Sequence, residues 1–212
     1  MNFLMVTAFC LCIHGQTKEA QGIPPRAAPT DYQSMVKTGG KTGSVTIAAE
    51  FTGHSVPTAQ GPLTTEDYVV VETAFFGDAD AKLKLSFDDF SLRINGKKTP
   101  LSGQPYGAVL SSLKDPEWQP AVPVDKKSKG GMSSGGGGGD KNDPPPSPPP
   151  IPIEVRRAMQ QRVQKATLPE GDRTLPQAGL IFFQYRGKTT GLQSIELIYT
   201  GPAGKASVAL QP

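Results

Sequence analysis

Alternation of apolar and polar residues is the main pattern in this chain, and it predicts short β-strands. The apolar residues at 45, 47, 49 and 51 fall on one face, as in a strand with one buried side. The run YVVVETAFF at 68–76 is rich in β-branched and aromatic residues and has turn-forming residues on both sides. We therefore expect 68–76 near the centre of a sheet.

Further runs of the same kind follow on both sides of a long polar region. Residues 83–87 and 90–94 predict two strands, and Asn95-Gly96 predicts a tight type I′ hairpin with a return strand at 97–101. Three later strands are expected at 179–185, 194–200 and 206–210. About seven to eight short strands without βαβ alternation predict a mainly β fold, an immunoglobulin-like antiparallel β-sandwich.

Residues 125–152 interrupt these strands and predict a disordered insert. The segment has seven Gly, seven Pro and seven charged residues, so it buries too little apolar surface to offset the entropy of ordering it. Its first half is Gly-rich and flexible, and its second half, PPPSPPPIP, favours an extended polyproline conformation. We expect one domain over 44–212, interrupted by this insert, with a disordered leader at 16–43.

One basic amphipathic helix is predicted at 153–166, directly after the insert. A narrow apolar stripe with helical spacing is formed by Val155, Met159, Val163 and Ala166. Four cations of this helix are candidate contacts to an anionic surface: Arg156, Arg157, Arg162 and Lys165. The alternative is a helix that packs its stripe on the sandwich and leaves a solvated charged face.

An apolar run at residues 3–13 predicts a signal peptide. It is too short to span a bilayer, and the polar sequence after Gly15 predicts cleavage near that residue. No Lys or Arg precedes the run, which departs from the usual pattern. A lipoprotein anchor at Cys10 or Cys12 is the alternative, although bulky residues before both cysteines fit a lipobox poorly. We expect a periplasmic or extracellular protein.

Composition removes several function classes. After cleavage near Gly15 the chain would contain no cysteine and a single histidine, His54, which excludes disulfides, thiolate catalysis and Cys/His zinc sites. The formal net charge of +3 comes without a domain-wide basic stripe, so we expect no nucleic-acid partner. The sequence predicts no cofactor.

The motifs that resemble catalytic or metal sites do not have the required context. Ser111 and Lys114 form an S-x-x-K, but K-T-G precedes it at 37–39 and 41–43, the wrong order for a penicillin-binding enzyme. His54 could act as a general base, but the sequence has no G-x-S-x-G motif to supply a nucleophile, so His54 is interpreted as an exposed loop histidine. The acidic residues match no calcium loop and are interpreted as turn formers: Glu66, Asp67, Asp78, Asp80, Asp88 and Asp89. We expect no enzymatic activity.

Parts of the chain resemble the telokin-like, immunoglobulin-like sandwich domains of unassigned function on secreted bacterial proteins. The resemblance covers 45–101 and 168–210 and rests on DFSL at 89–92, PEG at 169–171 and LIFF at 180–183. It implies an adhesive or accessory role and supplies no catalytic residues. The long insertion at 102–167 departs from the family pattern.

These observations predict an exported binding or accessory module of the cell envelope. Its partner would be a protein or another envelope component. The alternative is a structural protein that associates with a membrane or an anionic polymer through the basic helix.

Overall fold

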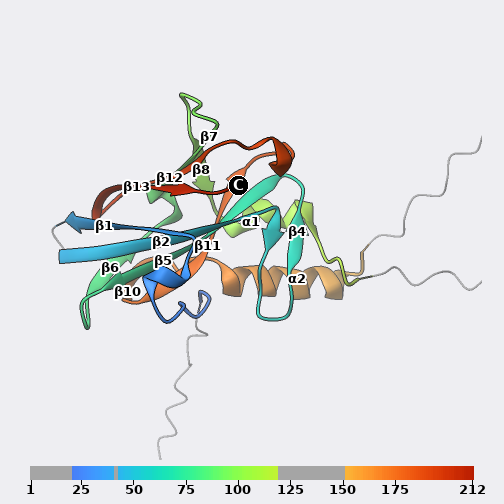
Figure 1. The fold of residues 1–212 in the computed structure, drawn as a ribbon. Coiled ribbons are helices and arrows are strands. Elements are labelled where there is room, and N and C mark those ends of the chain that lie inside the picture. The colour runs from blue at the N-terminus through green and yellow to red at the C-terminus, as the bar shows by residue number, and fades with distance from the viewer. Residues whose placement is uncertain (1–20, 41–42, 119–150) are drawn as a thin grey trace, which may run out of the picture.

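The main feature of the computed structural model is one antiparallel sheet of eight strands (Figure 1). The model describes residues 21–40, 43–118 and 151–212. In spatial order the strands are β1 (Ser34–Gly40), β2 (Gly43–Gly53), β5 (Tyr68–Gly77), β11 (Gln177–Gln184), β8 (Leu101–Gln104), β7 (Phe90–Ile94), β12 (Ile195–Gly201) and β13 (Gly204–Leu210). The predicted mainly β, antiparallel fold is therefore confirmed.

Two smaller sheets and a few helical segments complete the structure. The small sheets pair β10 (Gly171–Thr174) with β6 (Lys82–Leu85), and β4 (Leu63–Thr65) with both β3 (Ser55–Val56) and β9 (Leu113–Lys114). The α-helices are α1 (Tyr106–Val109) and α2 (Ile153–Ala166), and the 3-10 turns are η1 (Pro29–Asp31), η2 (Phe87–Asp89), η3 (Leu110–Ser112) and η4 (Thr189–Gly191). The helix predicted at 153–166 is thus confirmed with the same bounds.

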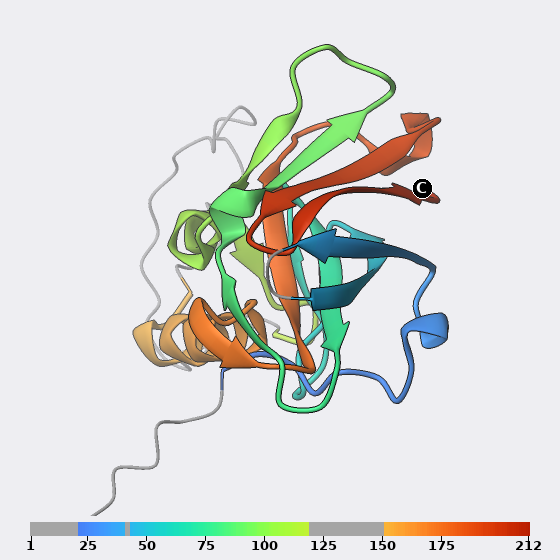
Figure 2. The same ribbon diagram turned by 90° about the vertical axis from the view of Figure 1, so that its left-hand side faces the viewer.

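The eight-stranded sheet curls until its two edge strands meet, which gives it a nearly barrel-like shape (Figure 2). Side chains of β1 bridge the seam to β13, where the Ser34 hydroxyl donates to the Ala209 carbonyl at 2.6 Å. The Thr38 hydroxyl donates to the Ala203 carbonyl at 2.9 Å. Side-chain hydrogen bonds thus join the two edges of the sheet.

The central strands β5 and β11 are buried on both faces, which explains why both are almost continuously apolar. Alternate residues such as Val71 and Ile181 point into the barrel and join its main core. The intervening residues, among them Val70 and Phe182, face outward and form a second core under α2. A third, smaller cluster on the outer face includes Tyr32 from the N-terminal segment. The sheet therefore has an outer face covered in part by α2.

Two sequence predictions differ from the structure. Residues 16–43 were expected to form a leader, but η1 and β1 lie within it, and β1 pairs with β2 along its whole length. Asn95 and Gly96 do form the predicted turn, with φ of 51° and 65°. The return strand, however, begins only at Leu101 and pairs with β7 at Ser91 and Leu92. The hairpin is therefore wider than predicted.

Other predictions fall outside the described part of the chain. The signal peptide at 1–15, with Cys10 and Cys12, lies there, as does the insert at 125–152 except for its last two residues. Strands on either side of this undescribed segment pair directly, since β11 lies between β5 and β8.

Candidate functional site

A groove lies between the first turns of α2 and the η3–β9 segment. Its volume is about 290 Å³. The floor is apolar and includes Leu110, Leu113 and Met159, while Arg156 and Arg157 line it from α2. Two of the four predicted site residues are therefore brought to one concave surface.

Arg156 and Arg157 are the exposed cations of this groove. Within the described residues neither side chain forms an ion pair. Pro152 precedes the helix and supplies no side-chain cap, but Glu154 in the first turn opposes the positive end of the helix dipole, so the positive charge of the groove comes from the two guanidinium groups. Ile153, at the rim, is 46% exposed and is one of two large apolar side chains that the described structure leaves exposed. Positive charge and exposed apolar surface thus meet at one place.

Arg162 lies elsewhere and has a different role. Its guanidinium forms an ion pair with Asp115 at 2.7 Å, and both side chains are about 15% exposed. It also donates to the Gly61 carbonyl at 2.9 Å and the Gln60 carbonyl at 3.2 Å. Arg162 therefore anchors α2 to the β3–β4 loop and to the residues after β9.

Lys165 occupies the last turn of α2, where a cation is favourable for the helix dipole. Its backbone carbonyl accepts a hydrogen bond from the Gly22 amide at 2.9 Å. Of the predicted site residues, only Arg156 and Arg157 line the groove.

The apolar stripe of α2 is turned toward the sheet. Met159, Val163 and Ala166 are buried and belong to the outer core, and Val155 is packed against it. The helix therefore packs on the sheet with its charged face outward, the alternative that the sequence left open.

A second, open pocket has a volume of about 520 Å³ and is lined in part by His54, which lies between β2 and β3. His54 lies in a turn, as expected, but it is not exposed as expected, because the side chain is half-buried and both ring nitrogens contact backbone carbonyls. Arg186, Lys188 and Glu66 also line this pocket. Periodicity could not reveal it, since the pocket wall comes from a loop more than 130 residues further along the chain.

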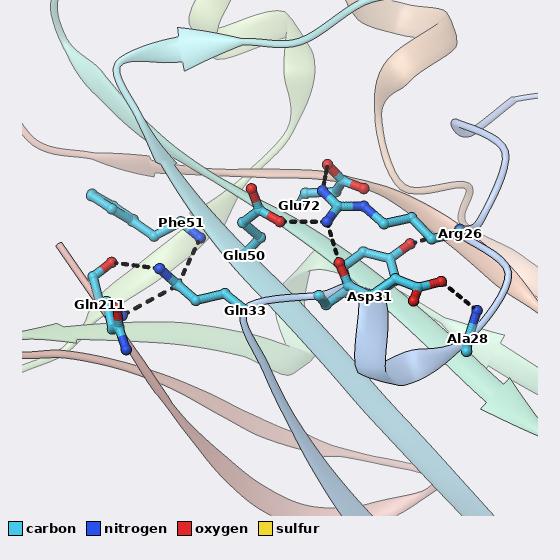
Figure 3. A network of polar contacts seen from close by, with 9 residues as sticks. Arg26, Ala28, Asp31, Gln33, Glu50, Phe51, Glu72 and Gln211 are labelled. Carbon is cyan, nitrogen blue, oxygen red and sulfur yellow. Dashed lines mark hydrogen bonds and ion pairs between the residues drawn. The ribbon is translucent and has the colours of Figure 1, made fainter.

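A partly buried polar network on the outer face of the sheet was not predicted (Figure 3). The Arg26 guanidinium lies 2.6 Å from Glu50 and 3.2 Å from Glu72, which are register partners on β2 and β5. It also stacks on the ring of Tyr32 and donates to the Asp31 carbonyl. The signal available in the sequence was Glu72, an acidic residue inside the apolar run at 68–76.

Burial sets the electrostatics of this network. Burial raises the pKa of the Glu72 carboxyl above its ordinary value, Arg26 opposes that rise and the Glu50 charge adds to it. Burial lowers the pKa of the Arg26 guanidinium, but the two carboxylates raise it, and the net direction is upward. The network therefore fastens the N-terminal segment to the sheet.

The remaining acidic and S-x-x-K residues do not converge on a reactive centre in the described structure. Ser111 is exposed, and Lys114 pairs with Glu66 at 2.5 Å. Asp78 accepts the turn hydrogen bond of the Ala81 amide through its backbone carbonyl. Within residues 21–40, 43–118 and 151–212, no three His, Cys, Asp or Glu side chains are grouped so that they could hold a metal ion.

Comparison with protein-family models, curated proteins and solved structures finds no match to this chain. Among the described residues, no helix has the length and apolar character needed to cross a membrane.

Proposed function

We propose that this protein is an exported, non-catalytic binding module of the cell envelope that docks an acidic segment of a partner protein in the groove beside α2. The observation that carries this proposal is the placement of Arg156 and Arg157, without ion pairs in the described structure, beside an apolar floor.

The side chains of the groove are suited to carboxylates. A guanidinium presents its N–H donors in a planar fork that matches a carboxylate, and arginine is enriched in protein interfaces. Arg156 and Arg157 both line the groove, so both guanidinium groups are available to acidic residues of one partner segment. An Asp or Glu of the partner is therefore the expected contact.

The size and floor of the groove favour a peptide side chain over a free small molecule. About 290 Å³ lies at the lower limit of small-molecule pockets, which usually bury most of their ligand. Leu110, Leu113 and Met159 offer an apolar floor for one aliphatic or aromatic side chain, and Ile153 extends it at the rim. We expect the partner segment to carry an apolar residue next to its acidic ones.

The buried stripe of α2 favours a protein partner over the alternative, an anionic membrane surface. A helix that lies in a membrane interface inserts its apolar face among the lipids. In α2 that face, including Met159 and Val163, is occupied by the outer core. Ile153 alone adds little apolar area to a membrane contact.

Export and the immunoglobulin-like class belong to the same proposal. Export rests on the apolar run at 3–13 and the polar sequence after it. The telokin-like resemblance rests on the sequence segments quoted above, and DFSL begins in η2 and continues into β7. A sandwich has two separate sheets packed face to face, whereas here eight strands are hydrogen-bonded into one continuous sheet. A crystal structure would test whether the domain belongs to the immunoglobulin-like class.

The groove is tested with fluorescent peptides in which Asp-Glu precedes Leu or Phe. Asn-Gln versions of the same peptides and vesicles of phosphatidylglycerol with phosphatidylcholine are measured in parallel. We expect the acidic peptides to bind, with affinity that falls as salt is raised. The double variant Arg156→Glu/Arg157→Glu should weaken binding by about tenfold or more, since two attractive charges become repulsive.

A matched control reverses two exposed lysines elsewhere, Lys97→Glu and Lys98→Glu, in the loop between β7 and β8 and far from α2 (Figure 1). This variant should bind the peptides as the parent does. Equal binding of acidic and amide peptides would refute the proposal. Sedimentation with the vesicles that depends on Arg156 and Arg157 would support the membrane alternative instead.

A further inference from the structure

Each ring nitrogen of His54 contacts a backbone carbonyl. Nδ1 lies 2.7 Å from the oxygen of Tyr68, at the start of β5. Nε2 lies 2.9 Å from the oxygen of Gly187, in the loop after β11. The ring thus bridges two parts of the chain that are far apart in sequence.

The two contacts have a chemical consequence, because both partners are hydrogen-bond acceptors only. A carbonyl oxygen cannot donate, and a neutral imidazole carries a single N–H. Both contacts are hydrogen bonds only when both nitrogens are protonated. We propose that His54 is a protonation-dependent latch, which as an imidazolium holds the loop at residues 187–190 against the start of β5.

The loop has few other fastenings. Within the described residues, the hydrogen bonds of 187–190 connect them to the amides of Gly191 and Leu192 and to the His54 ring. The residues before the loop are held separately, since the Tyr185 amide donates to the Asp67 carbonyl at 2.8 Å. At the other end of the loop, the side-chain amide of Asn95 donates to the Gly191 carbonyl at 3.2 Å. If the contact between His54 and Gly187 opened, the movement of the chain would therefore be confined to residues 187–190.

The charged groups around His54 are largely paired with each other. Arg186 forms an ion pair with Asp67 at 2.9 Å, and Glu66 pairs with Lys114. Lys188 also lines the pocket and has no ion pair within the described structure.

Among the described residues, the ring of Tyr185 stacks on His54 with centroids 6.5 Å apart, and Tyr68 contacts the imidazole through its backbone carbonyl. No carboxylate is among the hydrogen-bond partners of the ring, so its protonation state acts on the structure through the two carbonyls.

Loss of one proton would place a nitrogen lone pair against a carbonyl oxygen at less than 3 Å. That contact is repulsive, so one side of the bridge must open. Because Gly187 and Thr189 line the pocket of about 520 Å³, the pocket would change shape with the loop. Histidine is the side chain that commonly changes charge between about pH 5 and pH 8, so these two pH values are compared in the test. This pocket shares no lining residue with the groove beside α2.

The latch is tested by NMR on the full chain with ¹⁵N-labelled histidine. At pH 5 we expect both ring nitrogens of His54 to carry protons that exchange slowly with water. At pH 8 we expect a single ring proton. In uniformly ¹⁵N-labelled protein, the protection factors of the Gly191 and Leu192 amides, which donate to Lys188 and Thr189, should fall about fivefold or more between these pH values, while those in β5 stay constant.

In a chain that keeps residues 1–15, the variant His14→Gln assigns the second histidine and should leave the response unchanged. His54→Gln should give low protection in the loop at both pH values, because both N–H groups of an amide are on one nitrogen, whereas the imidazolium donates to the two carbonyls from two different nitrogens. A single ring proton at pH 5, or loop protection that does not change with pH in the parent chain, would overturn the proposal. The parent titration decides the question even if the variant fails to fold.

Discussion

Arg162 and Asp115 form an ion pair with 2.7 Å between their charged atoms, and both side chains are about 15% exposed. Arg162 comes from α2, after the segment that the structure leaves undescribed, and Asp115 comes from before it. The pair joins the two parts of the chain on the outer face of the sheet.

Replacing Arg162 with Met should lower the free energy of unfolding by about 2–4 kcal/mol. The substitution leaves a largely buried carboxylate without its partner and removes the donor to the carbonyls of Gln60 and Gly61. Urea unfolding followed by circular dichroism measures the change. Arg157→Met, on the same helix but exposed, should stay within about 0.5 kcal/mol of the parent. Equal effects of the two variants would contradict the anchoring role.

Replacing Glu72 with Gln should reduce the pH dependence of stability. Burial raises the pKa of the folded Glu72 carboxyl above the value of an unfolded glutamate, about 4.3. The folded state then binds more protons, so the free energy of unfolding falls as the pH rises from about 4.3 through the folded pKa. The variant should lose this part of the decrease and gain stability at neutral pH.

Urea unfolding at several pH values between about 4 and 7 measures the slope for both proteins. The variant should keep part of the pH dependence of its free energy of unfolding, because burial also raises the pKa of Asp89. An unchanged slope after Glu72→Gln would show that this carboxyl does not titrate as described.

Replacing Arg26 with Met should free the N-terminal segment that crosses the outer face. Arg26 bridges Glu50 and Glu72 and stacks on Tyr32, so its loss leaves two carboxylates near each other without a cation. We expect a loss of about 1–3 kcal/mol and faster proteolysis within residues 21–33. Limited proteolysis with mass spectrometry locates the cuts. Lys37→Met, an exposed position on β1, should be cut as slowly as the parent.

Replacing Gly179 with Ala should destabilise the protein by about 2 kcal/mol or more, through overpacking. A β-carbon at this position would lie 2.3 Å from the Cα of Leu168, where the chain passes close over β11. Gly107 in α1 has open space around it, so Gly107→Ala should be neutral or stabilising by up to about 1 kcal/mol. Thermal unfolding compares the two, and similar melting temperatures would refute the close approach.

The elements predicted well from the sequence are those whose signal is local. The run at 68–76 and the helix at 153–166 carry their own periodicity, and both form where expected. Strand β1 was missed because Met35 and Val36 are its only large apolar residues, and Met35 stays exposed. That strand depends on pairing with β2, which a local pattern cannot show.

The candidate site shows the same limit. Arg156 and Arg162 look equivalent on a helical wheel, since both lie outside the apolar stripe. Their difference comes from Asp115 and the loop at 58–61, which approach one side of the helix only in the folded chain. The bridging position of His54 likewise depends on a loop that folds back from β11.

The interleaving of strands has a consequence for any chain cut between residues 119 and 150. Strand β11 is inserted between β5 and β8, and β12 lies between β7 and β13. The fragment up to residue 118 would lack β11, the strand that joins β1-β2-β5 to β8-β7. In the fragment from residue 151, β12 and β13 are the only strands that neighbour each other. Neither half can form the complete eight-stranded sheet alone, so the two together would make a complementing pair whose reassembly reports on their association.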